Sequence, residues 1–304
     1  MFSIKLKSAL SFVFLFTACV ASAQEFEKPN LSSRSSFAIV VDKSTYEHAK
    51  EEIKAYKRVV EKDGLGTYII WSNWTSPDQI KSILHKLYLD KKSPLEGAVF
   101  VGNIPIPMLR DAQFLTSAFK MNQKIRWDKS SVPSDRFYDD FDLQFDYLKQ
   151  DTSKERELYH YYSLKANSPQ FIEMDIYSGR IKPPVQKGED MAVKIKDYLR
   201  KLVALRAQSY KLDDMIASYG HGYNSNSVNS IIGETQTLKS QFPYLFKPGG
   251  SIKFLNFRNA DFMKFNLLSE LKRDGLDFAY MTGHGTANLQ LLNGYPLVSN
   301  PQPS

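Results

Sequence analysis

The strongest constraint on the fold is a regular order of apolar runs and helical patterns in the first third of the chain. Three short apolar runs rich in β-branched and aromatic residues are typical of buried strands, and they span 37–42, 67–71 and 97–102. Helical spacing of apolar residues fills both intervals between them. Strand, helix, strand, helix and strand joined by short links predict a parallel sheet flanked by helices.

The ends of both helices are marked in the sequence. Ser44 followed by Glu47 forms a capping-box pattern, which predicts Ser44 as the N-cap of the first helix. Gly64 supplies the expected stop of that helix. The second helix is expected to start at Ser76, with Pro77 at the tolerated first position.

The middle of the chain is less regular. Residues 103–107 contain two prolines and are not expected to form a central strand, because each proline removes a ladder donor. Residues 175–180 return to a strand-like pattern, and residues 189–207 form a long basic amphipathic pattern typical of a helix.

A second α/β half is expected from about Asp213 onward. Its predicted elements are strands at 215–219, 252–256 and 278–281, a helix at 227–239, and a helix capped by Asn259. We therefore expect an α/β protein with two consecutive, mostly parallel sheets flanked by helices. The predicted division is a signal peptide at 1–23, a flexible lead-in at 24–36, a first subdomain at 37–185 and a second at 186–304.

Residues 1–23 have the pattern of a secretory signal peptide. Two lysines precede an apolar run at 9–18, and Ala21-Ser22-Ala23 is a small-x-small cleavage site that would leave Gln24 as the new N-terminus. The run is too short to cross a bilayer, so no transmembrane span is expected. The predicted location is the periplasm, the cell surface or the medium.

The single cysteine of the chain, Cys19, lies inside this leader. Thr17-Ala18-Cys19 resembles a lipoprotein box, but Phe16 stands where leucine is usual, so a lipid anchor on Cys19 is the less favoured alternative. After cleavage the chain would hold no disulfide, no thiolate metal ligand and no cysteine nucleophile.

The charge of the chain gives no indication of a nucleic-acid partner. The formal net charge is +7, and removal of Lys5 and Lys7 with the leader leaves +5. The surplus is spread along the chain, and no basic cluster with interleaved aromatic residues is present. We expect no nucleic-acid binding.

An acidic segment at 134–146 is a candidate calcium site. Its carboxylates at Asp135, Asp139, Asp140 and Asp142 are oxygen ligands of the kind that calcium prefers. The segment lacks the spacing and the glycine of an EF-hand loop, so a solvated polar loop is an equally favoured interpretation. No other cofactor is expected.

Four segments, taken in order, resemble the gingipain-type peptidases, which are secreted bacterial cysteine peptidases of the caspase-like clan. They are 95–102 with the Ile-Pro pairs after it, 134–139, 175–181 with the following helix, and the strand that ends Thr282-Gly283-His284-Gly285. The similarity runs from about Phe37 to Leu292. Each motif is weak alone, and their shared order carries the resemblance.

The resemblance implies a caspase-like fold and a Cys-His dyad that hydrolyses peptide bonds. His284 would be the acid–base residue and the backbone N–H of Gly285 would be an oxyanion donor. The family's nucleophilic cysteine ends the strand after the histidine, and no cysteine follows His284 here. The expectation is the N-terminal part of such a peptidase, truncated before its nucleophile, with an incomplete second sheet and no activity of its own. Proteins or peptides would be its substrates if it were completed.

Several alternatives remain beside this interpretation. His221 also sits in a Gly-His-Gly sequence, and we interpret it as a loop residue. The hydroxyl residues that could replace the missing cysteine show no nucleophile-elbow pattern, and they are Ser218, Ser225, Ser299 and Thr282. The chain could instead be a non-catalytic exported binding or assembly protein on the same scaffold. A further alternative is a surface lipoprotein that binds glycans through Trp71 and Trp74.

Overall fold

The computed structural model describes most of residues 24–207 and the core elements of residues 212–290. The described ranges are 24–112, 122–171, 173–207, 212–219, 236–237, 240–241, 243, 246–256, 263–282, 285–286 and 289–290. The chain divides into two compact units, residues 1–207 and residues 208–304, and each is described by itself. The predicted leader, with Cys19, lies outside the described residues.

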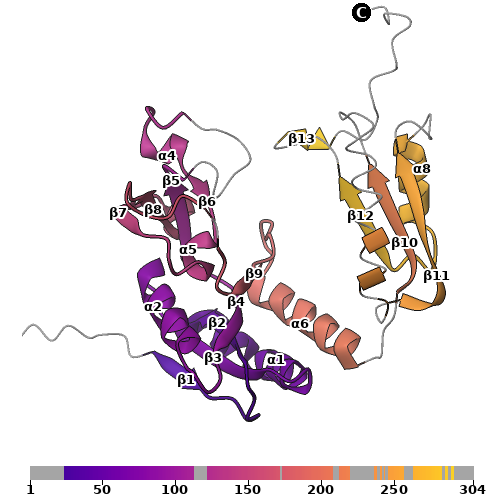
Figure 1. The fold of residues 1–304 in the computed structure, drawn as a ribbon, viewed down its shortest axis with the longest axis horizontal. Coiled ribbons are helices and arrows are strands. Elements are labelled where there is room, and N and C mark those ends of the chain that lie inside the picture. The colour runs from indigo at the N-terminus through magenta and orange to yellow at the C-terminus, as the bar shows by residue number, and fades with distance from the viewer. Residues whose placement is uncertain are drawn as a thin grey trace, which may run out of the picture. The chain divides into compact units, whose positions relative to one another are not determined.

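The first unit is built on a five-stranded sheet (Figure 1). The strand order is β1-β3-β2-β4-β9. All neighbours pair in parallel except β1, which runs antiparallel along β3. The strands are β1 (Glu25–Glu27), β2 (Ser36–Asp42), β3 (Gly66–Ser72), β4 (Leu95–Val101) and β9 (Tyr177–Ile181).

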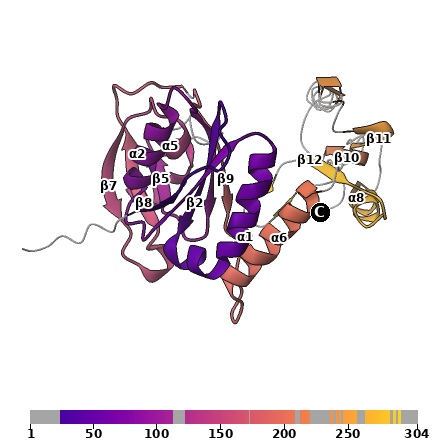
Figure 2. The same ribbon diagram turned by 90° about the horizontal axis from the view of Figure 1, so that it is seen from below.

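Helices cover both faces of this sheet, and the alternation along β2 shows why. Phe37, Ile39 and Val41 pack in one core cluster with α1 (Lys43–Lys62) and α6 (Met191–Ala207). Ala38 and Val40 point the other way and pack in a second cluster with α2 (Pro77–Tyr88). Figure 2 shows α1 and α6 side by side on one face. A strand buried on both faces reads as a continuous apolar run, as the sequence indicated.

A second, mixed sheet follows in the same unit and was not predicted. Its order is β6-β5-β8-β7, and only β5 and β8 pair in parallel. The strands are β5 (Ile106–Arg110), β6 (Val132–Pro133), β7 (Phe145–Gln150) and β8 (Tyr159–Leu164). Three short helical turns lie between them, namely α4 (Trp127–Ser130), α5 (Arg136–Asp139) and η1 (Lys154–Arg156).

The exclusion of residues 103–107 from a central strand is correct for the first three residues and wrong for the last two. Ile106 and Pro107 begin β5, which has neighbours on both sides. The N–H of Ile106 donates to Leu158 O, so the ring nitrogen of Pro107 faces the opposite side. On that side β6 is only two residues long, so a missing donor is tolerated there.

The second unit contains a three-stranded parallel sheet of order β11-β10-β12. Its elements are β10 (Leu212–Tyr219), β11 (Phe246–Asn256), α8 (Met263–Leu271) and β12 (Phe278–Thr282). A small antiparallel pair, β13 (Gly285–Thr286) and β14 (Leu289–Gln290), follows. The predicted α/β class, with sheets flanked by helices, is confirmed. Most of the helix predicted at 227–239 lies outside the described residues, and so does Asn259, the predicted cap of the following helix.

The start of α1 differs from the prediction. The N-cap is Asp42, whose Oδ1 accepts the N–H of Thr45 at 3.0 Å, and Ser44 is already helical. The predicted N-cap Ser44 is therefore wrong by two residues. The predicted start of α2, with Ser76 as N-cap and Pro77 next, is confirmed.

Two further features differ from the prediction, namely the position of the boundary between the two units and the structure of the lead-in at 24–36. The first unit extends to Ala207, because Ile195 and Leu199 of α6 are fully buried against α1 and the first sheet. Within the lead-in, β1 pairs with β3, and Glu27 forms an ion pair of 2.9 Å with the buried Lys57 of α1. Part of the expected flexible lead-in is therefore ordered at the sheet edge.

Candidate functional site

The predicted catalytic pair follows β12. Thr282 ends that strand and Gly285 begins β13, where it pairs with Gln290. His284 itself lies outside the described residues, as do Ser225 and Ser299.

The register of the second sheet brings the ends of two strands together. β10 and β12 are parallel neighbours, with Tyr219 opposite Thr282 at their carboxyl ends. Adjacent strands lie about 4.8 Å apart. Each of the two strands is followed directly in the sequence by Gly-His-Gly, at 220–222 and at 283–285. Of the hydroxyl residues considered as nucleophiles, Ser218 lies within β10 and Thr282 ends β12.

The carboxyl ends of β10 and β12 lie where the direction in which strands are added to the sheet reverses. The chain passes from β10 to β11 on one side and then crosses to β12 on the other side of β10. In open α/β sheets, ligands bind at the carboxyl ends of the strands at such a switch point. The sequence pattern predicts a loop position for His221, and it does not indicate that the strand before His221 neighbours the strand before His284. The repeated tripeptide was the available signal.

The opposite ends of β10 and β12 are tied together by a charged cluster. The N–H of Asp277 donates to Asp214 O at 3.0 Å, and the N–H of Asp214 donates to Asp277 Oδ2 at 3.3 Å. Arg273, which follows α8, pairs with the Asp214 carboxylate at 2.6 Å. These contacts link the two amino ends, so they support the register that aligns Tyr219 with Thr282.

The equivalent edge of the first sheet is occupied by the protein's own groups. Asp42 ends β2 there, between β3 and β4. Its Oδ2 accepts the N–H of Asn103 at 2.7 Å, while Oδ1 caps α1. Gly102 has φ +82°, and a Cβ on it would lie 2.1 Å from Asp42 Oδ2. The carboxylate therefore serves as a structural junction between β2, α1 and the end of β4.

The predicted calcium ligands are directed to separate partners. Asp135 forms a two-pronged ion pair with Arg180, with N–O distances of 2.8–3.0 Å. Asp139 Oδ2 accepts a hydrogen bond from Ser178 at 2.6 Å and pairs with Arg136 at 2.6 Å.

The other two calcium candidates, Asp140 and Asp142, also do not converge on one point with Asp135 and Asp139. Asp140 accepts the N–H groups of Leu143 and Glu173, and Asp142 is exposed. Over the described part of the chain, no group of three or more His, Cys, Asp or Glu residues is arranged to hold a metal ion. The calcium site stays a prediction that this geometry does not support.

Two buried groups in this region have altered acidity. Burial raises the pKa of Asp139 to about 6, and its Oδ1 is buried without a hydrogen-bond partner among the described residues. Burial lowers the pKa of Lys81 to about 8, although its ammonium donates to the carbonyls of Asp140 and Leu143. Lys81 links α2 to the acidic segment, and Asp139 links α5 to Ser178 of β9, so we interpret both groups as structural.

The two tryptophans considered for glycan binding are packed within the fold. Trp71 stacks on Tyr46, with ring centroids 3.9 Å apart. The indole N–H of Trp74 donates to Val41 O at 2.7 Å, and its ring packs against the α2-side core. A glycan platform at these two positions remains a prediction, and their packing does not favour it.

Comparisons with protein-family models, with curated proteins and with solved structures gave no match. Among the helices that the structure describes, none is long and apolar enough to cross a membrane.

Proposed function

We propose that this chain is the N-terminal part of a secreted gingipain-type cysteine endopeptidase with a caspase-like fold. In this proposal His284 is the acid–base residue of a Cys-His dyad, and the nucleophilic cysteine comes from a segment that follows residue 304. In this proposal residues 24–304 alone contain no nucleophilic cysteine and hydrolyse no peptide bond.

The observation that carries the proposal is the register of β10 and β12 in the sheet β11-β10-β12. It supports a site at the carboxyl end of β12, because that end flanks the switch point of the sheet. The residue two positions beyond Thr282 is His284. β12 is also an edge strand among the described strands, so a following strand that carried the cysteine could pair directly beside it.

The chemistry assigned to each group follows from thiol-dependent peptide hydrolysis. His284 takes the proton of the cysteine thiol, and the thiolate attacks the peptide carbonyl. The N–H of Gly285 donates to the oxyanion that develops on that carbonyl. The imidazolium of His284 then gives its proton to the leaving amine, so that the peptide C–N bond breaks and an acyl-enzyme thioester remains.

The first test is the intact mass of the native exported product. A mass well above that of residues 24–304 is expected, because the proposal requires a further segment with a cysteine. A native product that ends at Ser304 would refute the peptidase assignment and would favour the non-catalytic binding protein.

The second test uses two matched histidine variants of the native product. His284→Ala is expected to lower the kcat for a peptide substrate by about 10²–10⁴-fold, the usual contribution of a general acid–base group. His221→Ala is the control, because it removes the same side chain from the same tripeptide context. Equal losses in both variants, or hydrolysis by the 304-residue chain that depends on His284, would contradict the proposed roles.

A further inference from the structure

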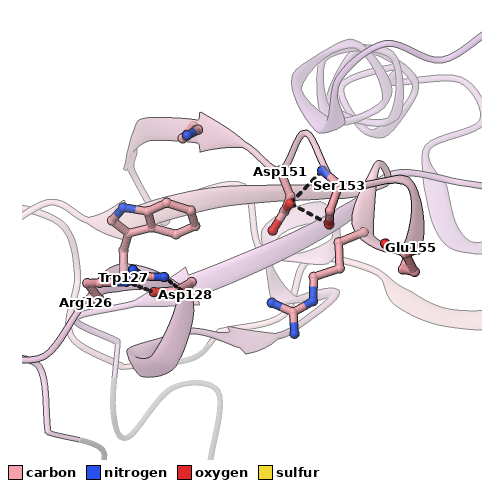
Figure 3. A pocket seen from close by; sticks show the side chains of 8 residues that line it. Arg126, Trp127, Asp128, Asp151, Ser153 and Glu155 are labelled. Atoms are coloured by element: carbon pink, nitrogen blue, oxygen red, sulfur yellow. Dashed lines mark hydrogen bonds and ion pairs between the residues drawn. The ribbon is translucent and has the colours of Figure 1, made fainter.

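The pocket between α4 and the turn before η1 indicates no class of ligand (Figure 3). Its volume is about 720 Å³, and the charged side chains that line it are three cations and three carboxylates, namely Arg126, Lys149, Arg156, Asp128, Asp151 and Glu155. These charges cancel. The ammonium of Lys149 also lies 5.6 Å from the centre of the Trp127 ring, so a cation already lies over that aromatic group.

A second pocket, of about 620 Å³, lies between β1 and α2 of the same unit. Its apolar lining comes from Phe26, Ile83 and Leu87. The polar side chains that complete the lining are Gln24, Gln79, Ser82 and Lys86. Phe26 remains 41% exposed, although its ring centroid lies 5.1 Å from that of Tyr68, so apolar surface is accessible in this pocket.

Gln24 is only loosely constrained by the fold. It is exposed, and no hydrogen bond joins its side-chain amide to another described residue. The chain becomes fixed one residue later, because Glu25 pairs with Trp71 in the register of β1 and β3 and forms an ion pair of 3.2 Å with Lys43. The amide of Gln24 is therefore free to react, while the strand that follows it is held in place.

We propose that Gln24 is the N-terminal residue of the exported chain and is converted to pyroglutamate. The proposal rests on the predicted cleavage after Ala23 and not on the peptidase assignment. Cleavage there leaves an α-amine on a residue whose side-chain amide is at the right distance to close a small, unstrained lactam. A terminal α-amine loses its proton more readily than a lysine ammonium, so part of it is a neutral nucleophile at neutral pH.

The reaction balances within the residue itself. The nitrogen of the α-amine bonds to Cδ of the side-chain amide, and the bond between Cδ and Nε2 breaks. Nε2 leaves as ammonia with a proton that the amine gives up, and the residue becomes a lactam. No oxidant, reductant or second substrate is consumed. The modification removes the terminal positive charge, as other N-terminal blocking groups do.

The surroundings of Gln24 favour the neutral ring over a free terminus. A free α-amine would add a second cation to a pocket that Lys86 already lines, and like charges repel each other. The lactam carries no charge, and its methylene groups suit the exposed apolar surface of Phe26.

The modification would protect the strand that neutralises a buried cation. Lys57 of α1 is only 1% exposed, and its ammonium pairs with Glu27 of β1 at 2.9 Å. An aminopeptidase that removed residues 24–27 stepwise would delete this carboxylate, and a buried charge that loses its partner is strongly destabilising. Because an aminopeptidase requires a free α-amine, a lactam at residue 24 blocks the first step.

The first measurement is the mass of the N-terminal peptide of the native exported product, taken at harvest and again after storage. The expected peptide begins at residue 24 and is lighter than its unmodified sequence by one molecule of ammonia. Amine-directed sequencing should fail on it, and treatment with pyroglutamyl peptidase should then expose Glu25. A free α-amine on Gln24 at harvest, or a lactam that forms only during storage, would refute the proposal.

Gln24→Asn is the matched variant. Asparagine keeps the amide, but its side chain is one methylene shorter and does not close an unstrained lactam, so its α-amine should stay free. Incubation with a broad-specificity aminopeptidase is expected to leave the native product intact and to shorten the variant from residue 24 onward. Gln24→Ala serves in the same assay if the leader of Gln24→Asn is cleaved at another position.

Two further results would contradict the proposal. One is a mature N-terminus at any residue other than 24, including a lipid-modified Cys19. The other is equal resistance, or equal loss of residues, in the native product and in Gln24→Asn, which would show that the lactam does not protect β1. These readouts concern only the N-terminus, so they are separate from the intact mass that tests whether the chain extends past Ser304.

Discussion

Replacement of Gly102 by alanine tests the junction at the carboxyl edge of the first sheet. Gly102 has φ +82°, a conformation that residues with a Cβ rarely adopt. Its added Cβ would lie 2.1 Å from Asp42 Oδ2 and 2.4 Å from Thr45 Oγ1. The carboxylate of Asp42 must therefore move away from Gly102, and its two backbone hydrogen bonds cannot both survive.

The cost has three parts that follow from these contacts. The left-handed backbone costs alanine about 1–2 kcal/mol. Loss of the Asp42 cap on Thr45 costs about 1 kcal/mol. Loss of the bond between the Asn103 N–H and the Asp42 carboxylate costs about 1.5 kcal/mol or more. The lower entropy of the unfolded alanine chain offsets part of this sum, so we expect Gly102→Ala to lower the free energy of unfolding by about 3 kcal/mol.

Gly64→Ala is the matched control. Gly64 has φ +96°, but a Cβ there would meet no atom within 4 Å. The backbone strain of about 1–2 kcal/mol is partly offset by the lower entropy of the unfolded alanine chain, so the net cost is about 1 kcal/mol. The two variants therefore differ in the loss of the Asp42 contacts and not in backbone conformation.

The assay is urea unfolding of the exported chain, followed by tryptophan fluorescence. All three tryptophans, Trp71, Trp74 and Trp127, lie in the first unit, so the signal reports on that unit. If the free energies of unfolding of Gly102→Ala and Gly64→Ala differ by less than about 1 kcal/mol, the Asp42 contacts do not stabilise the fold by the expected amount.

Three further substitutions test other buried contacts of the first unit. Asp139 has a pKa of about 6 in the folded protein against an ordinary 3.8, so its proton is bound more tightly in the folded state than in the unfolded state. This difference stabilises the fold at low pH, and the free energy of unfolding falls by up to about 3 kcal/mol as the pH rises from 4 through 6. Asp139→Asn should flatten that decline, and an unchanged difference between urea curves at pH 4.5 and 7.5 would contradict it. Arg180→Lys should cost about 2–3 kcal/mol, because lysine cannot reproduce the two-pronged pair with Asp135, and a change below 0.5 kcal/mol in urea unfolding would refute this. Glu27→Gln removes the 2.9 Å partner of buried Lys57 and should cost about 2 kcal/mol, with faster amide exchange in β1. Unchanged exchange would show that the pair does not hold β1.

The parallel sheet was predictable because its strands are buried on both faces. That environment produces short, continuous apolar runs, and β2, β3 and β4 all carry them. The start of α1 was not predictable to the residue, because Asp42 and Ser44 are both good capping residues. The structure favours Asp42, whose second oxygen binds the N–H of Asn103, 61 residues away.

Other features depend on pairings between distant segments that local patterns do not encode. The apolar stripe of α6 predicts a helix but does not specify the sheet against which it packs. The strands of the second sheet are short, and one contains Pro107, so they lack a clear signal.

Sequence reasoning located the Gly-His-Gly step after β12 but not its neighbour. The adjacency of the ends of β10 and β12 follows from the strand order, which could not be read from the pattern of either strand. For this reason His221 was interpreted as an unrelated loop residue, although its strand ends beside that of His284.

The position of β9 at the edge of the first sheet affects how the nascent chain folds. β4 gains its outer neighbour only when residue 177 has been synthesised, and the whole second sheet is made in the interval. At ordinary rates of synthesis that interval lasts on the order of 4–15 s. During it the side of β4 that later pairs with β9 has no partner strand, and β2 pairs only with its other side. The first sheet is therefore incomplete until β9 is available, and a chain that ends before residue 177 would leave the outer edge of β4 open to pairing with other chains.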